Sequence, residues 1–96
     1  MIGVDHIVEA VAAYHGRSVA DLMTDRRSRD LARGRQMAMA LAHELTHLSL
    51  AAIGKAFDRD QTAVLDACKN IEVLRRDRPF VDDEWRELMG ELMESA

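Results

Sequence analysis

The chain has 96 residues, enough for one domain (residues 1–96) with one modest hydrophobic core. Its formal net charge is −4, and its single cysteine excludes an internal disulfide, so we expect a cytoplasmic protein. No apolar stretch approaches the roughly 18 residues of a membrane span, and the start of the chain does not resemble a signal peptide. One proline and four aromatic residues, against many helix-forming residues, predict an all-α fold without a membrane partner.

The charge is unevenly distributed along the chain. Residues 17–35 contain six arginines and three aspartates, whereas residues 77–96 contain two arginines and seven acidic residues. A local basic surface can face phosphate groups even when the whole chain is acidic. Solvated helix surfaces would give the same distribution, so charge alone leaves both interpretations open.

Helical spacing of apolar residues predicts a first helix over residues 4–15. Gly16 follows it and is a favourable residue for ending a helix. Ser18, with Asp21 three residues later, is typical of the start of a second, short helix.

The stretch "TDRRSRD", residues 24–30, contains no apolar residue and is expected to be an exposed loop. A second amphipathic pattern starts at Arg33 or Gly34 and continues to His47. The stripe expected to face the core consists of Met37, Ala40, Leu41, Leu45 and Leu48.

A short helix, a tight turn and a longer helix follow in order. Ser49 is the expected N-cap of a helix that ends near Phe57, and Asp60 is the expected N-cap of a helix over residues 61–76. This arrangement predicts a helix-turn-helix, although an ordinary helical hairpin would show the same pattern. The segment "DRP" ends that helix, and a last helix is expected over residues 81–93. We therefore expect a bundle of about five to six helices with a helix-turn-helix of the Trp-repressor type.

In a helix-turn-helix, the first residues of the second helix reach base edges in the major groove. These residues are Asp60, Gln61, Thr62 and Ala63. A glutamine can pair with adenine through two hydrogen bonds, and a threonine offers both a hydroxyl and a methyl group. The aspartate can cap the helix and can also accept a hydrogen bond from cytosine.

One family resembles this sequence through four motifs. They are an R-R-x-R loop, A-R-x-R-Q-x-A-M, E-L-T-x-x-S-L-x-x-I-G-x-A-F and R-D-x-T-x-V-L-x-A, all between Asp25 and Arg75. Together they resemble the C-terminal DNA-binding domain of the bacterial chromosomal replication initiator DnaA, and the similarity extends over about residues 4–93. The resemblance implies an all-helical fold and binding of a short origin-type duplex DNA element at the nucleoid.

The resemblance also implies roles for individual residues. Arg27 of the basic loop matches the residue that enters the minor groove, where an arginine meets enhanced negative potential. The family's major-groove readers correspond to Asp60, Gln61 and Thr62. Positions that contact the DNA backbone correspond to Arg35, Gln36 and His43. Arg59 matches the arginine that precedes the signature aspartate and is a further expected DNA-binding residue.

Several positions depart from the family pattern. The usual R-D-H-T-T is "RDQTA" here, with Gln61 and Ala63 as the changes, and the turn "DRD" is one residue shorter than usual. Gly34 replaces a common proline, and His43 replaces a common lysine, so a permanent charge becomes a titratable one. These changes predict weaker DNA binding or a different target sequence.

Two non-catalytic functions follow from the resemblance, and both predict a monomer without cofactor or metal. The first is duplex-DNA binding in replication initiation, without ATPase activity, because no G-x-x-x-x-G-K-[ST] phosphate-binding loop occurs in the chain. The second is a stand-alone module that binds the replication initiator or its regulatory proteins.

The stretch "HELTH", residues 43–47, matches the H-E-x-x-H motif of zinc peptidases. On one helix, His43 and His47 would share a face, and Glu44 would be the general base. A catalytic zinc also needs a third protein ligand, and no recognisable third-ligand motif is present. We therefore expect no enzyme activity and no metal site.

Overall fold

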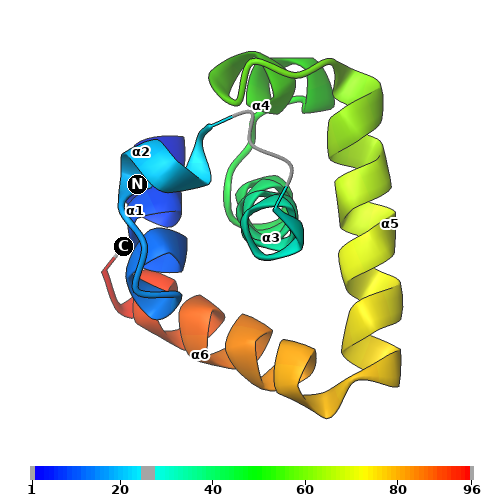
Figure 1. Cartoon of the computed structure of the whole chain (residues 1–96). Helices are drawn as coiled ribbons and strands as arrows, with labels where there is room; N and C mark the ends of the chain where they lie inside the picture. The colour runs from blue at the N-terminus through cyan, green and yellow to red at the C-terminus, as the bar shows by residue number, and fades with distance from the viewer. Residues whose placement is uncertain (1, 25–27, 96) are drawn as a thin grey trace.

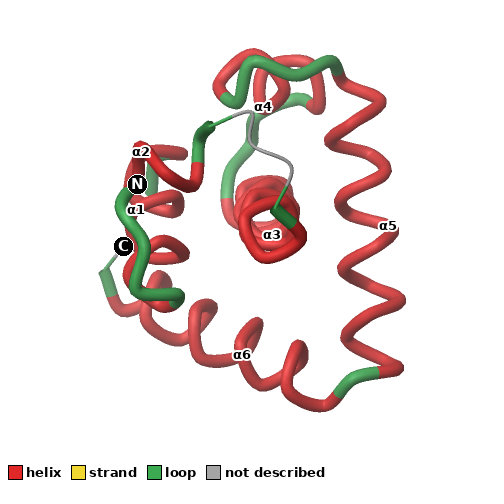
Figure 2. Tube along the Cα trace, viewed as in Figure 1, coloured by secondary structure: helices red, strands yellow, loops and turns green. Residues whose placement is uncertain are grey.

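The computed structural model describes residues 2–24 and 28–95. Within these residues the chain forms six helices and no strand (Figures 1 and 2). The helices are α1 (Val4–Tyr14), α2 (Val19–Leu22), α3 (Arg29–Leu45), α4 (Leu50–Ala56), α5 (Gln61–Asp77) and α6 (Pro79–Glu94). None of the described helices is long and apolar enough to cross a membrane. The expectation of an all-α fold is confirmed.

Side-chain caps fix where four of these helices begin. Ser18, Ser28, Ser49 and Asp60 each accept a hydrogen bond from the backbone N–H three residues later. The donor–acceptor distances are 3.0, 3.5, 3.1 and 2.9 Å, respectively. Such bonds satisfy N–H groups that lack a partner inside the helix. The caps expected at Ser18, Ser49 and Asp60 are therefore confirmed.

The long helix α3 differs from the expected boundaries at both ends. It begins at Arg29, four residues before Arg33, because Ser28 caps it and Leu31 is already buried against the core. It ends at Leu45, because the Thr46 backbone is extended and the Thr46 hydroxyl accepts a hydrogen bond from the Leu48 N–H. Leu48 therefore does not belong to the buried stripe, and 43% of its surface is exposed.

The ends of α1 and α6 follow from local chemistry. Gly16, which follows α1, has a φ of +64°, a left-handed conformation that costs glycine little. Proline is favoured at the first position of a helix, where its missing N–H would have no partner. Pro79 occupies that position, so α6 begins two residues before the expected Val81.

Helix α3 lies at the centre of the fold, and the hydrophobic core forms where it packs against the helices around it. Figure 1 shows α3 end-on with α1, α4, α5 and α6 around it. Every residue from Met37 to Ala42 of α3 is buried. Each neighbouring helix adds a few large apolar side chains to this core, which include Ile7, Val11, Ile53, Phe57, Val64, Ile71, Leu88 and Leu92. This packing sets α5 at a fixed position across the outside of α3.

One charged side chain lies inside the bundle. Glu84 of α6 is 1% exposed, and its carboxylate accepts hydrogen bonds from His15 Nε2 and Arg33 Nη2, both at 2.9 Å. Burial raises the pKa of this carboxyl, but the bonds from His15 and Arg33 outweigh burial and hold its pKa below the ordinary value. The Glu84 carboxylate thus links the end of α1, α3 and α6.

Candidate nucleic-acid interface

Helices α4 and α5 form the expected helix-turn-helix, and the turn between them is tightly hydrogen-bonded. After Phe57, the Asp58 N–H donates to the Lys55 carbonyl at 3.2 Å, and the Arg59 N–H donates to the Gly54 carbonyl at 2.8 Å. Asp58 has a φ of +56°, as the residue after a helix C-cap commonly does. The chain thus makes a left-handed turn with an aspartate where glycine is usual.

Gly54 allows this turn to pack directly on α4. A Cβ atom at this position would lie 2.6 Å from the Arg59 carbonyl oxygen and 3.1 Å from the Asp60 carbonyl carbon and oxygen. Real Cβ atoms essentially never approach so closely, and these atoms belong to the backbone. The spacing of α4 and α5 therefore depends on the absence of a side chain at residue 54.

The start of α5 presents two polar side chains to solvent. Asp60 Oδ1 accepts from the Ala63 N–H at 2.9 Å, which caps the helix and holds its first turn in place. Gln61 and Thr62 follow directly and are exposed, whereas Ala63 is half-buried. The structure thus leaves Gln61 and Thr62 accessible at the helix end from which a helix-turn-helix reads bases.

A small cleft joins the start of α5 to the start of α3. Its volume is about 170 Å³, and its lining includes Arg35, Gln36, Arg59 and Ala63. Arg59 Nη1 donates to the Phe57 and Asp58 carbonyls at 3.3 and 3.1 Å. The structure therefore brings three of the expected DNA-binding residues (Arg35, Gln36 and Arg59) together beside α5.

Within that cleft, Arg35 is held in the protein. It is only 9% exposed, and Nη1 donates to the carbonyl oxygens of Leu22 and Thr24 at 3.1 and 2.8 Å. These bonds fasten the chain between α2 and α3, just before residues 25–27. Sequence spacing placed Arg35 beside Gln36 but did not indicate this burial.

Two further residues expected to bind DNA, Arg27 and His43, are not placed in this cleft. Arg27 lies outside the described residues. His43 is exposed near the end of α3 and lines a separate cleft of about 380 Å³, together with Glu44, Cys68, Glu72 and Trp85. Burial raises the pKa of the half-buried Cys68 thiol, which favours its uncharged form near neutral pH.

The zinc-peptidase geometry is not formed by "HELTH". Because α3 ends at Leu45, His47 lies beyond the helix and does not share a helical face with His43. His47 instead lines a different groove, beside Leu48 and Met93. Among residues 2–24 and 28–95, no group of three or more histidine, cysteine or acidic side chains could hold a metal ion.

Other residues near Gln36 were missed by the sequence patterns. Arg29 and Arg33 belong to the first turns of α3, and they line a groove with Arg78 and Phe80 from the start of α6. The Gln36 Oε1 atom, on the rim shared with the smaller cleft, accepts from Asn70 Nδ2 at 2.6 Å. Arg29 and Arg33 are one helical turn apart, but the polar stretch that contains Arg29 resembles a loop in the sequence, and Arg78 is distant in the chain.

Helices α4 and α5 define a helix-turn-helix DNA-binding domain. The first is short, a tight turn follows it, and the second is longer and has polar residues at its exposed start. The sequence model for the bacterial DnaA protein helix-turn-helix matches residues 4–71, more than two thirds of the chain. The chain therefore belongs to the family of DnaA C-terminal helix-turn-helix domains, which are DNA-binding modules of replication initiation and not catalytic domains. The match covers α1 to α4 and most of α5, whereas the expected similarity continued to residue 93.

Proposed function

We propose that the chain binds a specific duplex-DNA element and acts in the regulation of replication initiation. The observation that carries the proposal is the start of α5. Asp60 caps this helix, the exposed Gln61 and Thr62 follow it, and the preceding turn packs directly on Gly54. These two side chains and the Asp60 carboxylate are the proposed base readers. Their donor and acceptor groups suit adenine, thymine and cytosine edges in the major groove.

The proposed backbone contacts come from residues on either side of these readers. Gln36 and Arg59 lie at the cleft beside α5, where phosphates flanking the major groove would pass. Arg35 supports the segment that precedes Arg27, the proposed minor-groove residue, so we assign Arg35 a positioning role. His43 is proposed as a further phosphate contact, because the resembling family commonly carries a lysine there.

A salt-titrated binding measurement tests the base-reading role of Thr62. The Thr62→Ala variant should bind the family's origin element about 5- to 150-fold more weakly, the range for one lost base contact. Its affinity for scrambled duplex and its dependence on salt should stay the same, because the threonine is not charged. Val73→Ala is the control, since Val73 is exposed on the same helix three turns further along.

Two outcomes would count against DNA reading at α5. One is a wild-type chain that binds the origin element and scrambled duplex equally. The other is a Thr62→Ala loss that appears equally on both duplexes. Because Gln61 and Ala63 depart from the family signature, a panel of elements altered at single base pairs belongs in the same titration.

We also propose several properties of the chain as a whole. Residues 1–96 form one domain and act as a monomer at the nucleoid, in the cytoplasm. They have no ATPase activity of their own, because the sequence contains no G-x-x-x-x-G-K-[ST] loop.

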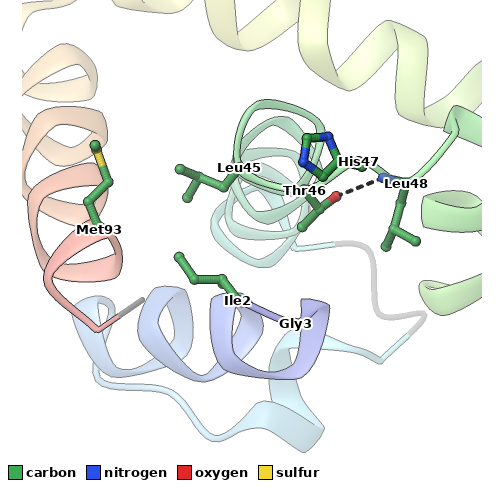
Figure 3. A pocket seen from close by; sticks show the side chains of 7 residues that line it. All are labelled: Ile2, Gly3, Leu45, Thr46, His47, Leu48 and Met93. Atoms are coloured by element: carbon green, nitrogen blue, oxygen red, sulfur yellow. Dashed lines mark hydrogen bonds between the residues drawn. The ribbon is translucent and has the colours of Figure 1, made fainter.

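A second candidate function is binding of the replication initiator or one of its regulatory proteins. An open groove of about 560 Å³ supports it. Figure 3 shows Met93 on the left, facing Leu45 and Ile2, and Leu48 on the right beyond Thr46. Leu48 is 43% and Met93 61% exposed, so apolar surface gathers where the end of α3 meets α1 and α6. Grouped exposed apolar residues are typical of protein-binding surfaces.

Paired variants separate the two functions in cells. If protein binding is the function, Leu48→Ser with Met93→Ser should abolish the effect on replication initiation and leave duplex binding unchanged. Thr62→Ala should then leave the cellular effect intact. If DNA reading is the function, Thr62→Ala should remove the cellular effect and the serine variant should retain it. Flow-cytometric counting of origins per cell gives the readout.

A further inference from the structure

A second basic groove lies beside the helix-turn-helix, between the start of α3, the later part of α5 and the start of α6. Its volume is about 490 Å³. Figure 1 looks along α3, with α5 and α6 on two sides of it. We name it the arginine groove after the residues that line it and carry its chemistry, which are Arg29, Arg33, Gln36, Asn70, Arg78 and Phe80.

The arginine groove has more hydrogen-bond donors than the protein uses. Arg29 and Arg78 are exposed, and in the described part of the chain their side chains make no hydrogen bond or ion pair. Arg33 donates to Glu84 through Nη2, while its Nη1 is buried without a partner among the described residues. Against three guanidinium groups, Asp30 is the one acidic side chain that lines the groove within residues 2–24 and 28–95. The surplus of positive charge suits a phosphate-bearing ligand.

An aromatic ring stands next to these cations. Phe80 is 57% exposed, although burying it would be favourable. The Arg33 guanidinium carbon lies 6.0 Å from the centre of the ring. Exposed rings beside arginines are what proteins use to stack the bases of single-stranded nucleic acids. The amide pair of Gln36 and Asn70 lines the same groove and keeps further donors and an acceptor for a base edge.

The shape of the groove favours an unpaired strand over a duplex. Helix-turn-helix proteins read duplex DNA with a protruding helix, whereas a concavity of this size holds a molecule of one or two nucleotides. Gln36 and Ala32 line both the arginine groove and the cleft that contains Arg59 and Ala63. The arginine groove therefore adjoins the cleft beside the start of α5.

We propose that the arginine groove binds unpaired nucleotides of a DNA strand next to the duplex element, with a base stacked on Phe80 and phosphates at Arg29 and Arg78. The location next to a bound duplex rests on the proposed function; the stacking site itself does not. Such a site would let this domain bind a duplex that ends in an opened strand in preference to an intact one.

Fluorescence anisotropy on the whole chain tests the proposal with three kinds of probe. These are the blunt origin element, the same duplex with a six-thymidine overhang at either 3′ end or either 5′ end, and a 12-residue oligothymidine. One of the overhangs should raise wild-type affinity roughly tenfold, within the range expected for stacking one base. Phe80→Ala should remove this gain and leave the affinity for blunt duplex unchanged.

Matched variants make the outcome specific. Arg29→Ala with Arg78→Ala should also remove the gain, and the affinity for the overhanging duplex should then depend less on salt. Arg86→Ala should do neither, since that exposed arginine of α6 pairs with Asp82 outside the groove. Thr62→Ala should weaken blunt and overhanging duplex equally and so keep their ratio. A gain that persists in Phe80→Ala, or no gain in the wild type, overturns the proposal.

Failure of the proposed function gives a different pattern. If the chain does not bind blunt duplex, oligothymidine should still bind weakly and lose that binding in Phe80→Ala. Comparing the affinity for a ribose version of the oligomer with that for oligothymidine distinguishes DNA from RNA as the source of the strand. Displacement of oligothymidine by a glutamate-rich peptide, with no overhang gain, would identify the groove as an acidic-peptide site and overturn the proposal.

Discussion

Replacing Gly54 by alanine is expected to lower the free energy of unfolding by about 3 kcal/mol, the upper part of the range for forcing an extra methyl into a packed site. The added Cβ would lie 2.6 Å from the Arg59 carbonyl oxygen, so the backbone of the turn itself has to move. The Arg59 N–H that bonds the Gly54 carbonyl lies in the same turn, so its hydrogen bond is strained as well. Urea unfolding followed by circular dichroism measures the loss.

The same substitution at Gly90 is the control. Gly90 is an exposed residue of α6, and a Cβ there would meet nothing within 4 Å. Gly90→Ala should raise stability by about 0.5–1 kcal/mol, because glycine inside a helix is less favourable than alanine. Equal effects at Gly54 and Gly90 would show that helix propensity, and not the packing of α4 on the turn, sets the effect at Gly54.

Moving the turn should also affect DNA binding. The first turn of α5 follows the turn directly, and Asp60, whose carbonyl lies 3.1 Å from the added Cβ, is also its N-cap. A displacement there shifts Gln61 and Thr62 relative to Gln36 and Arg59. Folded Gly54→Ala should therefore lose affinity for the specific element more than affinity for scrambled duplex.

The helix-turn-helix could be predicted from sequence because its signals are local. Ser49 and Asp60 are residue types favoured at the N-cap, so they indicate where helices begin, and both cap their helices in the structure. The proposed readers Gln61 and Thr62 follow from those caps by counting along the chain. Counting along the chain does not show that the turn packs closely on the backbone of Gly54, which lies seven residues before Gln61.

The features that could not be predicted from the sequence depend on packing between residues far apart in the chain. Leu31 is buried against the core, and this extends α3 back to Arg29 through a segment that looked fully polar. Arg35 looked like a surface cation, yet its guanidinium binds the Leu22 and Thr24 carbonyls. The arginine groove joins residues about 50 positions apart in the chain, and no pattern within one helix could have placed them together.

Removing the buried charge of Glu84 is the second change expected to have a large effect. Glu84→Gln keeps the size of the side chain but leaves Arg33 with a neutral partner in a place where Arg33 Nη1 is already buried and unpaired. Breaking a fully buried ion pair costs roughly 3–5 kcal/mol. Because the His15 and Arg33 side chains are 21% and 25% exposed, we expect a smaller loss of about 2–3 kcal/mol at pH 7.

Glu87→Gln on the same helix is the matched control. Glu87 is exposed, and its neutralisation should change stability by less than about 0.5 kcal/mol. Equal stability of Glu84→Gln and Glu87→Gln would contradict a structural role for the bonds that join α1, α3 and α6. Since Arg33 also lines the arginine groove, Glu84→Gln should in addition alter the overhang gain, which Glu87→Gln should leave unchanged.

The pH dependence of stability gives an independent test of the same contact. Because the folded-state pKa of Glu84 lies below its unfolded value, the carboxylate contributes stability above about pH 4.3, the ordinary pKa of a glutamate. That contribution is lost as the pH falls through the lower, folded-state pKa. The Glu84→Gln variant has no such contribution to lose, so the gap in unfolding free energy between it and the wild type should narrow below pH 4. A gap that stays constant from pH 7 to pH 3 would mean that the pKa of Glu84 is the same in the folded and the unfolded protein, so that the bonds from His15 and Arg33 do not stabilise the carboxylate.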